Sequence, residues 1–199
     1  MGISRKFSTV LFAMVLTVSS ALPVGITAHA APSSGEYTSG EIVSAGHNFF
    51  GSISNGLASI VERAISLYGQ PNGYIIGQEG SGAFVGGLRY GEGTLFTKNA
   101  GTRPVFWQGP SIGWDFGGDG ARTMMLVYDL EQIDKIYRRF AGVNGSAYLV
   151  GGVGMTVLAH TENGQKSMYV VPIRTGVGAR LGINIGYLKF SERATWNPF

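Results

Sequence analysis

Glycine interrupts this chain so often that it limits the folds the chain can adopt. There are 32 glycines among 199 residues, and from Gly73 onward they separate short runs of valine, isoleucine, tyrosine, phenylalanine and tryptophan. The glycines follow no three-residue period, which excludes a collagen-like chain, and the abundant aromatic and branched residues argue against disorder. Glycine within strands permits bulges and sharp bends. The pattern therefore predicts short, strongly curved antiparallel strands, as in a small barrel.

About ten segments have the composition and period of strands. They are 74–76, 83–85, 94–96, 105–107, 112–114, 122–128, 146–150, 155–159, 167–173 and 177–190, the last long enough for one or two strands. Met124 to Val127 is wholly apolar, which predicts burial on both faces near the centre of the domain. Asn163-Gly164 predicts a hairpin with a type I′ turn.

A long N-terminal helix is predicted over Thr38 to Tyr68. Thr38 and Glu41 have the spacing of a capping box, and the apolar residues that follow recur at helical spacing along one stripe. A glycine and then a proline follow the segment, as expected where a helix stops. We expect this helix to bend at Gly51 or Gly56, because glycine is a poor helix former.

A second, short internal helix is predicted to begin at Asp129 and to close at Gly142. Asp129 suits an N-cap, and Leu130, Ile133, Tyr137 and Phe140 would face inward. The predicted fold class is therefore mainly β (α+β). We expect an antiparallel, strongly twisted small β-barrel against which the long N-terminal helix packs.

The first thirty residues have the three parts of a secretory signal peptide. Arg5 and Lys6 form a basic start, an apolar run follows at 10–18, and Ala28-His29-Ala30 precedes the expected cleavage after Ala30. The apolar run is too short to cross the ~30 Å hydrocarbon core of a membrane as a helix. Residues 31–37 are then a flexible leader, and 38–199 form a single domain. The predicted location is the periplasm.

The chain contains no cysteine, which excludes a lipid-modified N-terminal cysteine, disulfides, thiolate metal sites and thiol catalysis. The remaining residues do not form a recognisable catalytic or metal-binding set. The glycine-rich stretches lack the spacing of nucleotide-binding loops, and His47 and His160 are not spaced as a metal pair. We therefore expect no cofactor and no enzymatic activity. The chain could also be compared with outer-membrane barrels because it ends in Phe199, but its strands are too short and glycine-rich for a lipid-facing band.

Basic residues are concentrated in the C-terminal part of the chain. The formal charge of +3 becomes +1 once Arg5 and Lys6 are removed with the signal peptide, so no nucleic-acid partner is expected. From residue 131 onward the basic side chains outnumber the acidic ones by four. The candidates for contacts with anionic lipid head groups are Lys135, Arg138, Arg139, Arg174, Arg180 and Lys189. The alternative for each is an ordinary solvated cation.

Four segments occur in an order that is typical of one family. They are YTSGEIVSAGHNF at 37–49, GSGAFVGGL at 80–88, PSIGWDFGG at 110–118 and YDLEQIDKIYRRF at 128–140. Through them the chain resembles envelope integrity protein A, and the resemblance covers nearly all of residues 36–199. The resemblance implies a periplasmic small β-barrel protein that is needed for cell-envelope integrity and has no established enzymatic reaction.

A more distant resemblance is to the SYLF lipid-binding domain. Residues 129–135 occupy the place of a short helix in that domain, after an apolar strand. This resemblance implies lipid binding, but the basic lipid-contacting residues of that domain cannot be mapped individually onto this chain.

Together these observations predict a non-enzymatic periplasmic protein that supports envelope integrity. It would bind an envelope lipid or glycan, or an envelope protein. Peripheral contact with a membrane is one way in which such binding could occur. Two alternatives stay open at this stage. One is a periplasmic hydrolase acting on envelope material, and the other is a structural scaffold with no small ligand.

Overall fold

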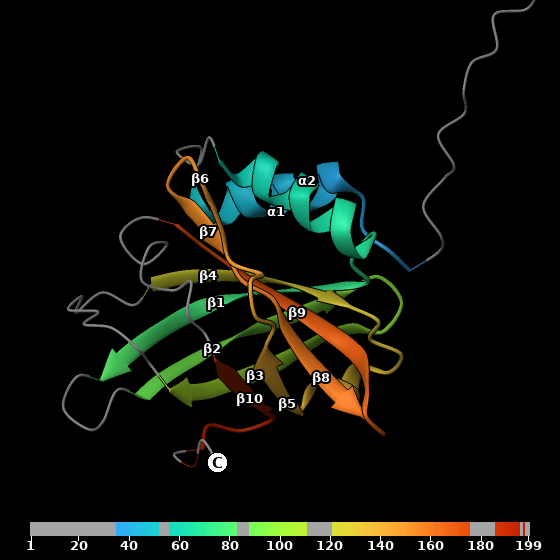
Figure 1. The fold of residues 1–199 in the computed structure, drawn as a ribbon, viewed down its shortest axis with the longest axis vertical. Coiled ribbons are helices and arrows are strands. Elements are labelled where there is room, and N and C mark those ends of the chain that lie inside the picture. Colours follow the sequence, from blue (N-terminus) through green and yellow to red (C-terminus); the bar gives the residue numbers. More distant parts are fainter. Residues whose placement is uncertain are drawn as a thin grey trace, which may run out of the picture. The chain divides into compact units, whose positions relative to one another are not determined.

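Eight antiparallel strands close into a barrel in the computed structural model of this chain (Figure 1). The order around the barrel is β4-β1-β2-β3-β10-β5-β8-β9, and pairing between β9 and β4 closes it. The strands are β1 Gly73–Gly82, β2 Leu88–Thr97, β3 Gly101–Pro110, β4 Ala121–Tyr128, β5 Arg139–Gly142, β8 Leu158–Glu162, β9 Gln165–Thr175 and β10 Tyr187–Ser191. Two short strands, β6 Tyr148–Val150 and β7 Val153–Met155, extend the sheet beyond β9. The predicted small antiparallel barrel is confirmed.

The structure describes residues 35–51, 56–82, 88–110, 121–175, 186–195 and 197. The predicted signal peptide, most of the leader and the strands expected at 83–85 and 112–114 lie outside these ranges. So does Arg180, and of the strand expected over 177–190 only residues 186–190 are described.

Strand β4 separates two apolar cores, because its side chains alternate between them. Met125 and Val127 belong to the core inside the barrel, whereas Met124, Leu126 and Tyr128 belong to a second core beneath the helices. All five side chains are almost completely buried, so the predicted burial of this strand on both faces is confirmed. Burying each such side chain contributes about 1.5–3 kcal/mol, which makes β4 central to the stability of both cores.

The N-terminal helical segment is two helices, α1 Ser39–Phe50 and α2 Leu57–Tyr68, so the prediction of one long helix is wrong. The expected capping box is present, with the Glu41 amide donating to Thr38 Oγ1 over 3.3 Å and the Thr38 amide donating to Glu41 Oε2 over 2.8 Å. The first helix ends because Gly51 adopts a φ of 86°, which reverses the helical twist. Both helices lie over the outer side of the barrel near β4 (Figure 1).

The predicted internal helix is also wrong, because only a four-residue 3-10 turn, η1 Ile133–Ile136, forms there. Asp129 has a φ of 60° and cannot take the extended conformation of an N-cap. The Asn72 side chain binds both backbone groups of Leu130, accepting from its amide over 3.2 Å and donating to its carbonyl over 2.9 Å. Phe140 then enters β5 opposite Leu188, inside the barrel. Sheet pairing thus overrides the helical spacing of the apolar residues.

The hairpin predicted at Asn163-Gly164 is confirmed. Asn163 and Gly164 have φ angles of 52° and 79°, as a type I′ turn requires, and they join β8 to β9. Neither of the two described α-helices is long and apolar enough to cross a membrane.

Candidate functional site

A buried carboxylate marks the most unusual position inside the barrel. Ile75, Gly77 and Glu79 alternate along β1, and all three face the barrel interior. Glu79 is only 5% exposed. A carboxylate in such a place is costly unless it is paired, so its partners determine whether the fold tolerates it.

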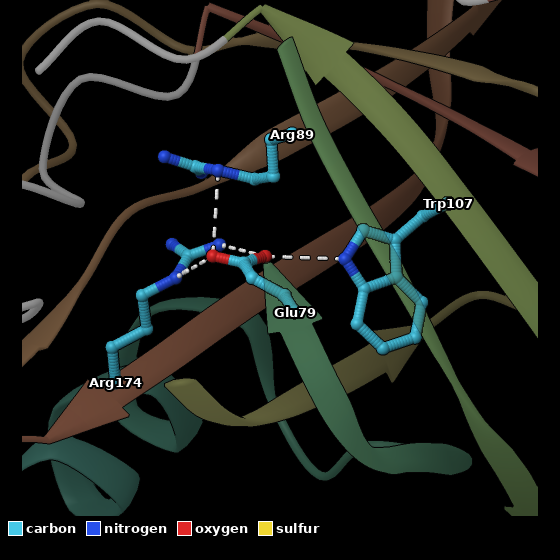
Figure 2. Close-up of polar contacts among 4 residues, drawn as sticks. All are labelled: Glu79, Arg89, Trp107 and Arg174. Carbon is cyan, nitrogen blue, oxygen red and sulfur yellow. Dashed lines mark hydrogen bonds and ion pairs between the residues drawn. The ribbon is translucent and has the colours of Figure 1, made fainter. Parts of the chain in front are cut away.

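Two arginines from other strands supply the opposite charge (Figure 2). Arg174 of β9 binds Glu79 with two parallel hydrogen bonds, from Nε to Oε1 and from Nη2 to Oε2, each 2.8 Å long. Arg89 of β2 lies close by, with its Nε 3.4 Å from Oε1. The fork of Arg174 matches the carboxylate geometrically, which is the strongest arrangement for such a pair. The three charged side chains tie β1, β2 and β9 together.

Trp107 of β3 completes the cluster. Its Nε1 donates a 3.1 Å hydrogen bond to Oε2 of Glu79 (Figure 2). The two residues are on strands that are not neighbours, since Glu79 lies opposite Gly91 of β2 and Gly91 lies opposite Trp107. A Cβ atom on Gly91 would lie 2.1 Å from Trp107 Cε2, so the indole occupies the space of the missing side chain. Glycine at position 91 is what allows the contact.

The charge state of Glu79 follows from these contacts. Burial by itself would raise the pKa of this carboxyl group, because it disfavours the charged form. The charges of Arg174 and Arg89 and the hydrogen bonds from Arg174 and Trp107 outweigh burial, so the pKa of Glu79 lies below its ordinary value. Glu79 is therefore ionised at neutral pH.

A cavity of about 300 Å³ lies on the outer face of the barrel, over β1, β2 and β3. We call it the outer-face cavity. The outward-pointing residues that line it are Gln78 and Gly80 of β1, Tyr90 and Glu92 of β2, and Phe106 and Gln108 of β3. They form two rows across the sheet, because Gln78 is opposite Glu92, Glu92 is opposite Phe106, and Tyr90 is opposite Gln108. Glu79 and Trp107 also contribute to the lining.

The C-terminal segment forms one wall of this cavity. Ala194 and Thr195 belong to the lining. Thr195 Oγ1 donates to Gln108 Oε1 over 3.1 Å, and Gln108 Nε2 donates to Ser191 Oγ over 3.3 Å. Both groups of the Gln108 amide are thereby held in place, and the segment covers the outer end of β3.

The outward side chains of the lining combine aromatic rings with amides, a hydroxyl and the carboxylate of Glu92. Tyr90 and Phe106 are half-buried, whereas Gln78 and Glu92 are exposed. No lysine, arginine or histidine is among the described residues that line the cavity. A small number of polar groups between aromatic surfaces is typical of small-molecule binding sites, in which the polar groups fix the orientation of the ligand. In the described part of the chain, no three histidine, aspartate or glutamate side chains gather into a metal site.

The basic residues predicted from the sequence do not form one group. Arg174 is buried against Glu79. Arg139 and Lys189 lie opposite each other on β5 and β10, and Lys189 Nζ donates to the Asn197 carbonyl over 3.0 Å. Lys135 and Arg138 line a separate small hollow, where Lys135 pairs with Glu131. The structure thus places the five described members of the set in three different surroundings.

The sequence analysis missed the buried cluster and the outer-face cavity. One signal was available, because the period-two pattern of β1 puts Glu79 on the same face as Ile75. A carboxylate on a buried face requires a cationic partner. Arg89 comes from the neighbouring strand β2, whereas Arg174 is brought to Glu79 by the pairing of β4 with β9 that closes the barrel, and no local pattern at either arginine reveals this role.

Comparison with known proteins places the chain in a family. Residues 35–199 match the family model described as envelope integrity protein A. A crystal structure described as a β-barrel-like, uncharacterized protein from Brucella abortus is 63% identical, with a TM-score of 0.77, over 83% of this chain and 99% of that one. No curated protein matches. The chain therefore belongs to the envelope integrity protein A family.

Proposed function

We propose that this chain is an exported periplasmic protein that supports envelope integrity by binding an envelope glycan in the outer-face cavity. The observation that carries the proposal is the pattern of aromatic and amide side chains across β1, β2 and β3. Amides and carboxylates bind sugar hydroxyl groups, and aromatic rings pack against the apolar faces of sugar rings. The family supports a role in the envelope.

The packing inside the barrel favours an external site over an internal one. The described interior is occupied by large side chains, among them Trp107, Phe140 and Phe190. Phe140 and Phe190 pack edge to face with their ring centroids 5.4 Å apart. Such an interior is a packed core, so an acyl chain would have to displace it in order to bind there.

The charges of the cavity favour a neutral glycan over an anionic lipid head group. Glu92 supplies the carboxylate that faces the cavity, since the carboxylate of Glu79 is turned into the barrel and paired with Arg174, and the described lining includes no basic side chain. A phosphate group would meet this carboxylate and gain no cationic partner from the described lining. Hydroxyl groups, in contrast, donate hydrogen bonds to carboxylates and amide oxygens.

The proposal is for binding without catalysis. Hydrolysis of a glycosidic bond commonly uses a carboxylic acid whose pKa is raised so that it can donate a proton. The pKa of Glu79 is shifted in the opposite direction, and its oxygens are engaged by Arg174 and Trp107. These contacts suit a structural role in which Glu79 stays charged.

Co-sedimentation of the mature protein with purified envelope polysaccharide and, separately, with vesicles containing anionic lipid tests the proposal. We expect binding to the polysaccharide that changes little with salt. Gln78→Ala and Glu92→Ala should weaken it, while Glu62→Ala, which alters an exposed residue of α2, should not. Binding to the anionic vesicles alone, with strong dependence on salt, would contradict the proposal and favour the basic residues.

A further inference from the structure

A second hollow, open and about 870 Å³ in volume, lies between α1 and the outer face of β1. We call it the α1 groove. Ser44 and Asn48 line one side of it from α1, and Tyr74 and Ile76 line the other side from β1. Ser44 and Asn48 are exposed and are four residues apart, so their side chains lie on the same helix face.

The α1 groove and the outer-face cavity share strand β1. Alternate residues of β1 lie on its outer face, and Tyr74 and Ile76 line the groove while Gln78 and Gly80 line the cavity. At about 3.4 Å per residue, Tyr74 and Gly80 are about 20 Å apart. The two hollows are therefore consecutive sections of one strand face.

The end of α1 lies at the level where the cavity begins. Arg122 of β4 is directly opposite Gln78 in the sheet, and its Nη1 donates a 2.9 Å hydrogen bond to the carbonyl oxygen of Phe49. Phe49 is the last but one residue of α1 and also lines the groove. The helix thus follows β1 from Tyr74 to the level of Gln78, so the groove leads toward the cavity.

The chemistry of the groove matches that of the cavity. Tyr37, Tyr74 and Phe49 supply aromatic surface, while Ser44 and Asn48 supply a hydroxyl and an amide. The carboxylate of Glu41, the acidic residue in its lining, is neutralised by Lys98, whose Nζ lies 3.0 Å from Glu41 Oε2. The lining residues of the groove therefore offer hydrogen bonds and aromatic contacts without net charge, which suits a neutral sugar chain, and the guanidinium of Arg122 lies at the end of the groove beside Phe49.

We infer that the α1 groove and the outer-face cavity form one track along β1 that holds an extended, uncharged glycan chain of several sugar units. This inference rests on the proposed function and specifies its ligand: a single sugar fills the cavity alone, whereas a longer chain continues along β1 into the groove. The affinity then depends on the length of the chain.

Calorimetric titration with a size-fractionated series of neutral oligosaccharides, released from envelope polysaccharide, tests the track. We expect the longest fractions to bind at least about tenfold more tightly than the shortest, a difference of about 1.4 kcal/mol. The double variant Ser44→Ala, Asn48→Ala removes the hydroxyl and the amide of the groove, so it should lose most of this length dependence and leave the affinity for short fractions unchanged. Alanine favours helices, so this variant is expected to keep the fold.

Other results separate the inference from the proposed function. Gln78→Ala should weaken the binding of every fraction, because it alters the cavity, and Glu62→Ala on α2 is the matched surface control. If affinity does not change with length, or if the α1 double variant has no effect, the track is overturned while the proposed function stands. If no fraction binds, the proposed function fails and the track fails with it.

Discussion

The indole of Trp107 reaches Glu79 across an intervening strand, over the position of Gly91, which has no side chain. This contact joins the two parts of the site. Glu79 is held inside the barrel by Arg174 and Arg89, and both Glu79 and Trp107 also line the outer-face cavity. The buried cluster therefore connects, from inside the barrel, the three strands β1, β2 and β3 whose outer face carries the cavity.

Gly91→Ala is expected to destabilise the protein by about 1–3 kcal/mol, since the new methyl group must displace the indole ring of Trp107. Chemical denaturation followed by circular dichroism measures the free energy of unfolding. Gly80→Ala is the matched control, because no heavy atom of the described residues lies within 4 Å of the position that its Cβ would take. Equal stabilities for Gly91→Ala and the wild type would show that the indole does not occupy this space.

Glu79→Gln is expected to cost about 3–5 kcal/mol, because it removes the charge that compensates two buried guanidinium groups while keeping the shape of the side chain. Glu92→Gln makes the same chemical change on the exposed outer face of β2 and should alter the free energy of unfolding by less than about 0.5 kcal/mol. Similar losses for the two variants would refute a structural role for the buried carboxylate.

The contribution of Glu79 should also depend on pH. Its folded-state pKa lies below the ordinary value of 4.5, so the unfolded chain takes up the proton first as the pH falls. The stabilisation is therefore complete above a pH of about 4.5 and is lost as the pH falls through the folded-state pKa. We expect the stability difference between wild type and Glu79→Gln to be constant near neutral pH and to shrink in acid. A stability difference between the two proteins that grows as the pH falls would contradict this prediction.

Tyr128→Phe is expected to raise the free energy of unfolding by about 1 kcal/mol. The ring of Tyr128 is buried beneath the helices, and its hydroxyl has no hydrogen-bond partner among the described residues. Burial and the nearby Tyr68 raise the pKa of this hydroxyl, so it is neutral at physiological pH. Tyr128→Ala should instead cost about 3–5 kcal/mol through the cavity it creates. Thermal melts should show a higher Tm for Tyr128→Phe and a lower Tm for Tyr128→Ala than for the wild type. A lower Tm for Tyr128→Phe would contradict the prediction and indicate that the hydroxyl has a partner such as water.

The elements that the sequence predicted correctly are those decided by local chemistry. Thr38 and Glu41 form their capping box within four residues, and Asn163-Gly164 forms its turn from the conformational freedom of two neighbours. The wholly apolar run in β4 required burial on both sides wherever the strand was placed. In each case the residues concerned supply the interactions that determine the structure.

The predictions that failed depended on distant parts of the chain. Phe140 has helical spacing from Tyr137 and Ile133, yet pairing with β10 makes it part of a strand. The side chain that holds Leu130 in a non-helical conformation comes from Asn72, 58 residues earlier. Arg174 looked like a surface cation because its buried partner, Glu79, is 95 residues away. Contacts over such separations are set by how distant strands pair and leave no local pattern.

The most direct test of a glycan site on the outer face is a titration of isotopically labelled mature protein with neutral envelope oligosaccharides, followed by amide chemical-shift changes. The account predicts that the changes gather at Gln78, Tyr90, Glu92, Phe106 and Gln108, with Thr195 on the covering segment. No saturable change at these residues, or changes confined to Lys135, Arg138 and Arg139, would contradict it.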